Sequence, residues 1–423
     1  MRVFLPPLAV AAMLCFVSPQ VKAAETQNSF LATPNSTSKS GSHERRLTLD
    51  EALAAALERN PGLAAAKHEA AAGDGQVTQA GLMPNPSIDV SVDDTKKATR
   101  TTTALLSMPV ELGGKRAARV SAAELSRDIA RQDVHSARAT LRAAVVTAFF
   151  DMAVAQEAVR VTEQNVDIAS GALRLAERRV AAGKAPPLES GKAGVALANS
   201  RIEARAARAK LEDARRNLSV LWGENDPDFG YVTANIDALP TRETLDALRA
   251  SLAESPFMQS GRIAVQLGEA QVAVEKSKRF PDITLSAGIA RDNEAGRDKP
   301  QIGISIPLPL IDRNQGNVYA ASMQAYKAKD TFRDLEARLT ADLLRAVTQF
   351  DLALATAKDY RSSVLPGATQ AYESARKGFE AGKFGFLEVL DAQRTLSDGN
   401  IAYLKVVATA YQARSEIDRL LGH

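Results

Sequence analysis

Two acidic side chains, Glu388 and Asp391, stand three residues apart in the stretch FEAGKFGFLEVLDAQ, which runs from Phe379 to Gln393. Residues three apart on a helix lie on the same face, so both carboxylates are expected to point to one side. Such a group of acids favours cations and responds to pH. The same acids, at the start of a helix, can instead complement its dipole, which is worth about 0.3–1 kcal/mol each. The sequence leaves both interpretations open.

The turn before these acids has a counterpart in the first half of the chain. The stretch VAAGKAPPLESGKAG, from Val180 to Gly194, shares with it an Ala-Gly-Lys turn followed by a Leu-Glu pair. Glycine is favoured where a helix ends in a left-handed residue, so both turns are predicted to end helices. The turns can serve to dock a partner protein, or simply to cap a helical hairpin. The candidate docking residues are Gly183, Lys184, Leu188, Gly382, Lys383 and Leu387.

Long helices must carry these turns. Between Lys115 and Ala182 there is no proline and one glycine, Gly171. As a single helix this stretch would be roughly 100 Å long, too long for the inside of an ordinary globular domain. Apolar residues recur every seven positions, at Val145, Met152, Val159, Val166, Leu173 and Val180. This period predicts coiled-coil packing, in antiparallel helical hairpins at about 115–222 and about 315–421.

Each hairpin is preceded by two segments with the alternation of a strand. Ile88, Val90 and Val92 alternate with polar residues, and the second half of the chain repeats the pattern. Period two with β-branched residues predicts strand-loop-strand units at about 87–109 and about 282–307, the second with a loop from Arg291 to Lys299. The chain therefore reads as two structural repeats, 47–222 and 244–423, joined by a linker at 223–243.

The first 23 residues have the features of a cleaved secretory signal peptide: a basic start, an apolar core and small residues before Ala24. Residues 24–46 are rich in Ser, Thr and Asn and predict a flexible leader. The only cysteine, Cys15, lies inside the signal. Lipid attachment at Cys15 is an alternative, disfavoured by Leu14 before it. No mature segment is apolar enough over 18 residues to predict a transmembrane helix.

Composition argues against several classes of function. The formal net charge is only +3, which does not indicate a nucleic-acid binder. The four histidines are scattered, at His43, His68, His135 and His423, without the spacing of a zinc site. No catalytic set or phosphate loop occurs in a suitable context. We therefore expect no enzyme activity, no bound metal and no cofactor.

Four strands cannot close a barrel, and their open edges would lack hydrogen-bond partners in lipid. Three copies would supply twelve strands, an even number within the known range of membrane barrels. The same threefold arrangement would place twelve helices around a hollow cylinder. The predicted fold is thus mainly α with a small β part, forming a trimer with a 12-stranded β-barrel and a long α-helical tunnel.

The duplicated plan resembles the TolC-like outer-membrane channels, from LTLDEALAAALERNP at Leu47 to the end of the chain. Within that family, VELGGKR (110–116) and PLPLIDRNQGN (307–317) are most similar to the outer-membrane components of heavy-metal pumps. The resemblance implies a homotrimeric conduit in outer-membrane lipid, extending into the periplasm. It also implies a periplasmic adaptor (membrane fusion) protein, an inner-membrane RND pump, and export of divalent heavy-metal cations.

By the same resemblance, Glu388 and Asp391 match the two aspartates of the acidic constriction ring of TolC. Phe384 stands where TolC has an arginine that helps to lock the closed entrance, and Lys383 is next to it. Within the channel class, the alternatives are efflux of drugs and other organic compounds, or type I secretion. A periplasmic adaptor is a distant alternative, because it would have one hairpin where this chain has two.

Overall fold

The computed structural model describes residues 45–234 and 238–423 of the chain. These residues lie within one compact unit, Gly41–His423. The expected signal peptide, 1–23, and nearly all of the expected leader, 24–46, fall outside the described residues. Within the described part, regular structure begins one residue earlier than expected, because Arg46 pairs with Tyr231 in a short parallel ladder.

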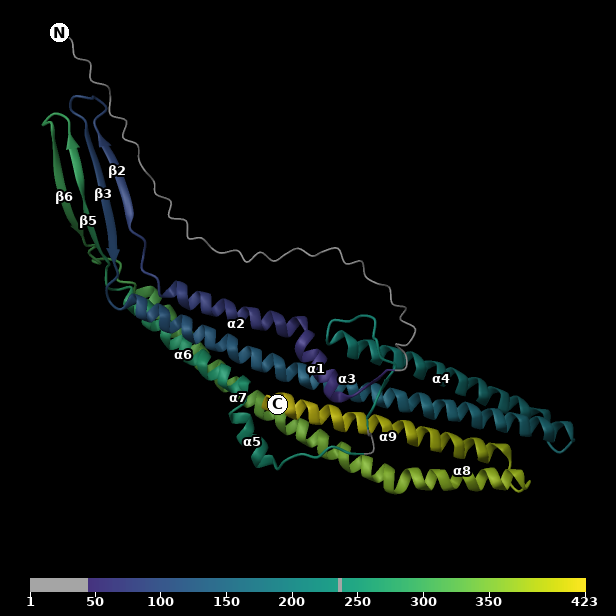
Figure 1. Cartoon of the computed structure of the whole chain (residues 1–423). Helices are drawn as coiled ribbons and strands as arrows, with labels where there is room; N and C mark the ends of the chain where they lie inside the picture. Colours follow the sequence, from purple (N-terminus) through teal and green to yellow (C-terminus); the bar gives the residue numbers. More distant parts are fainter. Residues whose placement is uncertain (1–44, 235–237) are drawn as a thin grey trace, which may run out of the picture. The chain divides into compact units, whose positions relative to one another are not determined.

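The described chain passes twice through the same series of helices and strands (Figure 1). The first pass contains β1 (Arg46–Leu47), α1 (Leu49–Arg59), α2 (Pro61–Ala80), β2 (Ser87–Asp93), β3 (Thr101–Val110), α3 (Lys115–Ala181), α4 (Pro187–Val220) and β4 (Tyr231–Val232). The second contains α5 (Leu245–Ala253), α6 (Pro256–Ser277), β5 (Ile283–Asp292), β6 (Arg297–Ser305), α7 (Gln315–Asp359), η1 (Tyr360–Val364), α8 (Leu365–Glu380) and α9 (Phe386–Leu421). The fold is mainly helical with a small sheet.

Both passes start their short helices with the same local chemistry. Thr48 and Thr244 cap α1 and α5, and each side-chain oxygen accepts a hydrogen bond from a backbone N–H of the first turn. Asn60 and Ser255 cap α2 and α6 in the same way, and each is followed by proline. Proline is suited to this position, because the first N–H of a helix has no intrahelical partner.

A single four-stranded antiparallel sheet joins the two passes, in the order β2-β3-β5-β6 (Figure 1). Register is fixed across the centre by Leu106, which lies opposite Ile88 on one side and Ala287 on the other. The outermost strands, β2 and β6, each have one unpaired edge. Pro300 lies in β6, and an edge strand is where proline is tolerated.

The loop expected between Arg291 and Lys299 is longer than the turn in the structure. β5 continues to Asp292 and β6 starts at Arg297, so only four residues form the turn. Two ion pairs join the ends of these strands: Arg291 with Asp298 at 3.2 Å and Lys299 with Asp292 at 2.7 Å. Arg291 and Asp298 lie directly opposite each other in the ladder, and Lys299 reaches Asp292 diagonally. Cross-strand pairs of opposite charge support a ladder, which explains why polar residues here are strand and not loop.

The two faces of this sheet differ in polarity. Side chains directly opposite one another in the ladders share a face, so the register sorts them. One face carries Ile88, Val90, Leu106, Met108, Leu285, Ile289, Ile302 and Ile304, all of them exposed. The other carries Ser87, Asp89, Ser91, Thr103, Ser107, Ser286, Gln301 and Ser305. On the central strands β3 and β5 the apolar face is the more exposed of the two, the reverse of a sheet in a water-soluble domain.

The helices pack in layers with the same order as the strands. Nearest the sheet, α2 packs on α3, α3 on α6, and α6 on α7. Towards the turns, α4 packs on α3, α3 on α9, and α9 on α7 and α8. The outermost helices of these layers, α2 and α4 at one side and α7 and α8 at the other, have a free flank, as β2 and β6 do.

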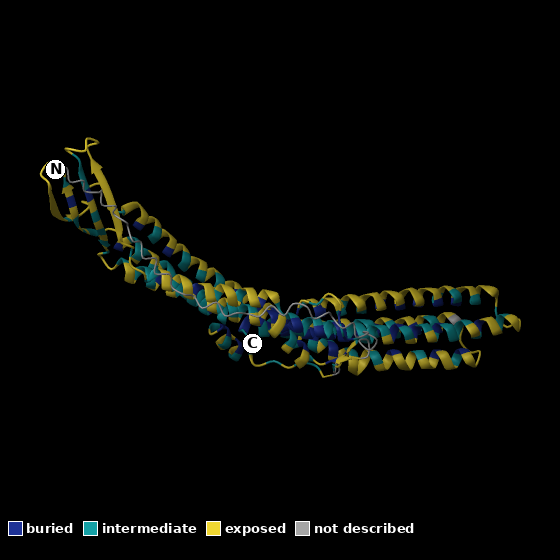
Figure 2. Cartoon of the chain, turned by 45° about the horizontal axis from the view of Figure 1, so that its top comes forward, coloured by how far each residue is buried: buried dark blue, intermediate teal, exposed yellow. Residues whose placement is uncertain are grey.

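The largest buried cluster lies where α1, β1, β4 and the chain after α4 cover the middle of α3 (Figure 2). Phe149 and Met152 of α3 are almost fully buried there, beneath Trp222 and Phe229. A second cluster joins α5 to α7 and α9 through Leu248, Phe350 and Ile417. We call these covering segments, residues 45–59, 221–234 and 238–253, the belt.

Among the described residues one helix, α3, is long and apolar enough to cross a membrane by length and composition alone. Its most apolar 18-residue window has a mean hydropathy of 1.2, and 39% of that window is buried. The expectation of no such helix is therefore not met by this criterion. The same helix packs against α1, α2, α4, α6 and α9, and these neighbours account for its apolar character.

Pro366 lies within the second long helical run, and the irregularity of the helix precedes it. The π-helical turn η1 occupies Tyr360–Val364, and the helix continues through Pro366 as α8. Proline has no N–H, and its ring clashes with the carbonyl four residues earlier, here that of Ser362. Widening the turn around that carbonyl lets the helix pass the proline without breaking.

Candidate functional site

The two Ala-Gly-Lys turns are built alike, which explains why the chain repeats them. At the end of α3, the N–H of Lys184 donates to the carbonyl of Arg179 and that of Gly183 to Val180. At the end of α8, Lys383 and Gly382 make the equivalent bonds to Gly378 and Phe379. Gly183 and Gly382 both have positive φ, of 69° and 73°. This is the Schellman motif, in which a left-handed glycine satisfies the last carbonyls of a helix.

The two hairpin ends of the chain contact one another. The guanidinium of Arg179 lies 4.5 Å from the centre of the Phe379 ring, and its Nη1 donates to the Phe379 carbonyl at 3.5 Å. Arg179 Nε also lies 3.6 Å from Glu189, at the start of α4. Around them Ala176, Ala193 and Val389 form a small buried cluster. One arginine thus joins both hairpins at their ends.

Of the predicted acids, Glu388 lies in the first turn of α9 and Asp391 one turn further, and both are exposed. Glu388 folds back over the start of its own helix, since a Cβ added at Gly385 would lie 2.8 Å from its Oε2. This placement fits the helix-dipole interpretation for Glu388. The described residues hold no ion pair or hydrogen bond to either carboxylate.

The structure brings two of the predicted docking residues and one of the predicted acids to the lining of one hollow. Leu188 and Leu387 line a 280 Å³ hollow between the two hairpin ends, together with Glu388. Both leucines are more than half exposed. The four turn residues Gly183, Lys184, Gly382 and Lys383 are exposed beside it. Phe384 packs back over Gly378, where an added Cβ would collide with its ring.

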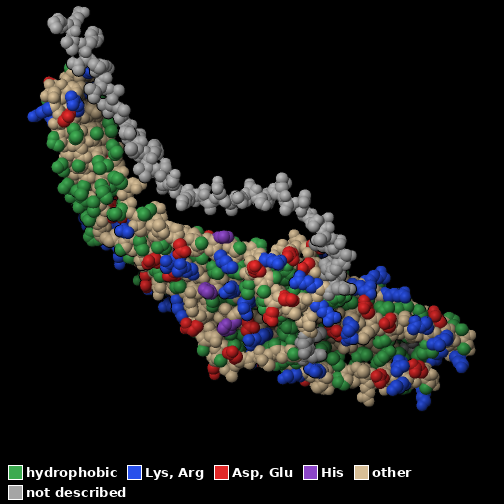
Figure 3. Space-filling view, viewed as in Figure 1, with side chains coloured by type: hydrophobic (Ala, Val, Ile, Leu, Met, Phe, Trp, Pro, Cys, Tyr) green, Lys and Arg blue, Asp and Glu red, His purple; other side chains and the backbone are tan. Residues whose placement is uncertain are grey.

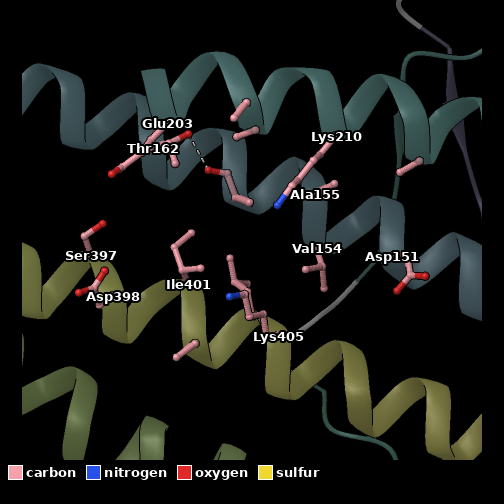
Figure 4. A pocket seen from close by; sticks show the side chains of 16 residues that line it. Asp151, Val154, Ala155, Thr162, Glu203, Lys210, Ser397, Asp398, Ile401 and Lys405 are labelled. Carbon is pink, nitrogen blue, oxygen red and sulfur yellow. Dashed lines mark hydrogen bonds between the residues drawn. The ribbon is translucent and has the colours of Figure 1, made fainter. Parts of the chain in front are cut away.

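A larger groove, of about 640 Å³, opens between α4 and α9 with α3 at its floor (Figure 4). Its surface is mostly apolar and rich in alanine, including Ala155, Ala158 and Ala206. Asp151 lies at one end and accepts a 2.9 Å hydrogen bond from Gln412. Burial raises the pKa of Asp151 above its usual value, and the bond from Gln412 opposes this only in part.

Four charged side chains border the groove in two like-charge pairs. Glu203 of α4 and Asp398 of α9 lie on opposite sides at one end, and Lys210 and Lys405 lie further along (Figure 4). Within the described part of the chain, none of these four side chains has a hydrogen bond or an ion pair. Next to the acids, a polar hollow of 80 Å³ is lined by Asn165, Gln393 and their neighbours.

The histidines do not come together as a metal site. His68, His135 and His423 are exposed and His43 lies outside the described residues. Residues 45–234 and 238–423 contain no group of three or more His, Cys, Asp or Glu side chains placed to hold a metal ion.

In each half of the chain a strand pair is followed by a long helical hairpin. The family model described as outer membrane efflux protein matches residues 52–224 and 247–423. The chain belongs to this family. The resemblance to TolC-like channels that the sequence indicated is thereby confirmed.

This efflux protein is similar to several characterised relatives. It is 43% identical over 422 residues to the cobalt-zinc-cadmium resistance protein CzcC of Cupriavidus metallidurans, a match that covers 100% of this chain and 99% of the relative. A membrane protein from Pseudomonas aeruginosa superimposes with a TM-score of 0.78 at 19% identity, covering 88% of this chain and 90% of the other. The channel CusC superimposes with a TM-score of 0.77 at 17% identity, over 90% of this chain and 93% of that one.

Sequence reasoning found the hairpin ends of this efflux protein but missed the groove. A signal was present: Glu203 and Lys210 are seven residues apart in α4, and Asp398 and Lys405 are seven apart in α9. An acid and a lysine at this spacing lie on one helix face. That the two faces oppose each other depends on how α4 and α9 pack on α3, which no local pattern specifies.

Proposed function

We propose that this chain is the outer-membrane channel subunit of a tripartite efflux pump that exports divalent heavy-metal cations. The observation that supports the channel is the sheet, which carries exposed apolar side chains on one face and all its serines and most of its threonines on the other. An apolar outer surface and a polar interior are what a barrel in lipid requires.

Closure of the sheet and the helical layers into a ring of three copies is supported by the unpaired edges of β2 and β6 and the free flanks of the outermost helices. The sheet and both helical layers have the same internal order, each beginning with elements of the first repeat and ending with elements of the second. A threefold axis would set β6 beside β2 of the next copy, and α7 or α8 beside α2 or α4. Twelve strands at their usual spacing and tilt give a barrel roughly 24 Å across between opposing backbones.

The belt indicates which side of the helical layer encloses the tunnel. Gln156 of α3 bonds both backbone groups of Val232, at 2.7 and 3.1 Å, so this side of α3 is covered by the belt. A lumen on that side would be filled by the belt itself. The opposite side of α3 would then face the lumen.

The hairpin ends form the entrance in this arrangement. Three copies of Glu388 and Asp391 would place six acids around one axis, at a mouth that favours cations. Gly183, Lys184, Leu188, Gly382, Lys383 and Leu387 would meet a periplasmic adaptor protein, which links the channel to an inner-membrane RND pump.

Heavy metals are the proposed cargo because of the full-length similarity to a cobalt-zinc-cadmium resistance protein. The test is growth of a deletion strain on Zn, Co, Cd, Cu and Ni and on several antibiotics, with and without the gene restored. Metal sensitivity that the gene reverses is expected. Sensitivity to antibiotics alone would replace metals with organic compounds as the cargo.

The entrance acids are tested by conductance in planar bilayers with and without divalent cations. Glu388→Gln with Asp391→Asn is expected to reduce cation preference and divalent block. The matched control is Glu373→Gln, an exposed acid on α8 away from the turns. Unchanged selectivity and block in the double variant would leave only the helix-dipole role.

Adaptor docking is tested with single cysteines at Lys184 and at Lys383. Cys15 is the only natural cysteine and lies in the expected signal peptide, so the introduced thiol would be unique in the mature chain. Cross-links to the adaptor are expected in an active pump, while a cysteine at exposed Arg249 of α5 should give none. Equal labelling at all three positions would count against docking at the turns.

A further inference from the structure

The groove between α4 and α9 has the size and surface of a small-molecule site. Its volume, about 640 Å³, falls within the range of about 300–1,000 Å³ that ligand pockets occupy. Alanines and the side chains of Val154, Ile401 and Leu404 supply an apolar lining, and polar groups lie at its borders (Figure 4). An apolar surface with a few placed polar groups is the usual composition of a binding pocket.

The charges at its borders are arranged in a way that the chain alone does not explain. Both α4 and α9 run from the hairpin ends toward the belt, so their seven-residue spacings run in parallel. Glu203 therefore faces Asp398, and Lys210 faces Lys405 (Figure 4). Seven residues of helix place the acid pair about 10 Å from the lysine pair along the groove.

Like charges that face one another are unfavourable, and here no partner within the described chain offsets them. The opposite side of the same helices differs. There Glu163 of α3 and Arg208 of α4 form an ion pair at 2.6 Å. Charge pairing is thus satisfied on the belt side of this layer and left open at the groove.

The groove lies on the side away from the belt. Ala158, in its floor, is two positions after Gln156 and so points to the opposite side of α3 from the residue that bonds Val232. If the proposed tunnel is correct, the groove opens into its lumen, where a passing molecule can reach it. The inference rests on the proposed function for this location only, because all its walls come from one chain.

We propose that this groove is a transit site for a zwitterionic amphiphile, an organic molecule with a cationic and an anionic group about 10 Å apart on an apolar body. The cationic group would lie between Glu203 and Asp398, and the anionic group between Lys210 and Lys405. Opposite charges would then alternate across the groove, and the apolar body would cover the alanines. The channel would thereby handle an organic cargo class beside metal cations.

A metal ion alone fits this arrangement less well. An ion between the two carboxylates would leave the lysine pair unpaired and the apolar lining exposed to water. A purely cationic or purely anionic amphiphile would satisfy one pair and leave the other. Only a molecule with both charges and an apolar body pairs with the acids, pairs with the lysines and covers the apolar lining. This requirement for both charges can be tested with simple probes.

The probes are 8-aminooctanoate, octylamine and octanoate, each titrated by calorimetry into the full-length protein in lipid nanodiscs, with empty discs as blank. Extended 8-aminooctanoate separates its charges by about the spacing of the two pairs, while the other two carry one charge each. We expect 8-aminooctanoate to bind about tenfold or more tightly than either single-charge probe.

Paired variants assign the two ends. Glu203→Gln with Asp398→Asn should weaken the binding of 8-aminooctanoate about tenfold and leave the binding of octanoate unchanged. Lys210→Gln with Lys405→Gln should also weaken the binding of 8-aminooctanoate about tenfold and leave the binding of octylamine unchanged. Ala206→Phe should fill the groove and weaken all three probes. Glu163→Gln with Arg208→Gln, on the belt side of the same helices, is the matched control and should bind as the natural protein does.

Two results would overturn the site: octylamine binding as tightly as 8-aminooctanoate, or the acid-pair variant binding like the control. Calorimetry reports on the groove even if the protein forms no pores in planar bilayers. If the protein binds 8-aminooctanoate selectively but forms no pores, the channel is rejected and the binding site stands. If it forms pores but does not bind 8-aminooctanoate selectively, the binding site is rejected and the channel stands.

Discussion

The guanidinium of Arg179, at the end of α3, lies 4.5 Å from the ring centre of Phe379, at the end of α8. The two residues belong to different repeats, and Glu189 of α4 holds the same guanidinium at 3.6 Å. A cation over an aromatic face, with a carboxylate behind it, fixes both hairpins with one side chain.

Removing the charge of Arg179 should loosen the hairpin ends. Arg179→Met keeps the apolar stem but loses about 0.5–2 kcal/mol of cation–π attraction. Spin labels at Lys184 and Lys383 are expected to show a broader distance distribution by pulsed electron resonance. Arg208→Met removes a surface ion pair elsewhere and should leave the distribution unchanged. A narrow distribution in Arg179→Met would mean that the small apolar cluster alone holds the ends.

The buried amide of Asn165 donates to the hydroxyl of Ser397 at 2.6 Å, between α3 and α9. Ser397→Ala would leave the amide N–H without its partner and should cost about 1–3 kcal/mol in unfolding free energy. Replacing both groups, Asn165→Leu with Ser397→Ala, should cost less than the single change, because no buried polar side chain is left unpaired. Thermal unfolding of Ser397→Ala, Asn165→Leu and the double variant checks this, and additive costs would exclude the coupling.

The carboxyl of Asp151 makes the free energy of unfolding depend on pH. Burial raises its pKa in the folded state, so the charged form is disfavoured and the folded state binds a proton more tightly than the unfolded state. Its destabilising effect is present above the folded pKa and disappears as pH falls to the unfolded value, about 3.9. Asp151→Asn should therefore melt at a higher temperature than the natural protein at pH 7–8 and at the same temperature near pH 4. A constant difference across this range would contradict the assignment.

Adjacent residues of β6 offer a test of the membrane-facing side of the sheet. Ile302 is 89% exposed on the apolar face, and Gln301 lies on the polar face. Ile302→Lys is expected to cost about 2–4 kcal/mol if it sits near the middle of the bilayer. Gln301→Lys should be tolerated, because its side chain would point into water. The measurement is the amount of heat-modifiable trimer recovered from outer membranes, and equal recovery of both variants would reject the barrel.

Much of the fold could be predicted because its signals are local. The alternation of Ile88, Val90 and Val92 indicated a strand, and the glycines of the two turns indicated helix ends. Local signals failed where neighbours intervene. The charged stretch from Arg291 to Lys299 reads as a loop by itself, yet cross-strand ion pairs make most of it strand. The helix passes Pro366 without a break because a π-helical turn precedes it.

The residues of the candidate site also include some that the sequence predicted and some that it did not. The acids and turn residues at the hairpin ends were found because a repeated motif carries them. The contact of Arg179 with Phe379 and the facing charges of the groove were not found, because they join segments from different repeats.

By itself, the sequence determined the duplicated order of helices and strands, the two glycine turns and the family. These depend on the period of apolar residues and on the backbone preferences of glycine and proline, which act over a few residues. Only the tertiary structure decided that the apolar face is the more exposed one on the central strands β3 and β5, and that α4 and α9 oppose like charges across α3. Whether a given face of a strand or helix contacts solvent or another element depends on packing between segments far apart in the chain, and no local interaction specifies it.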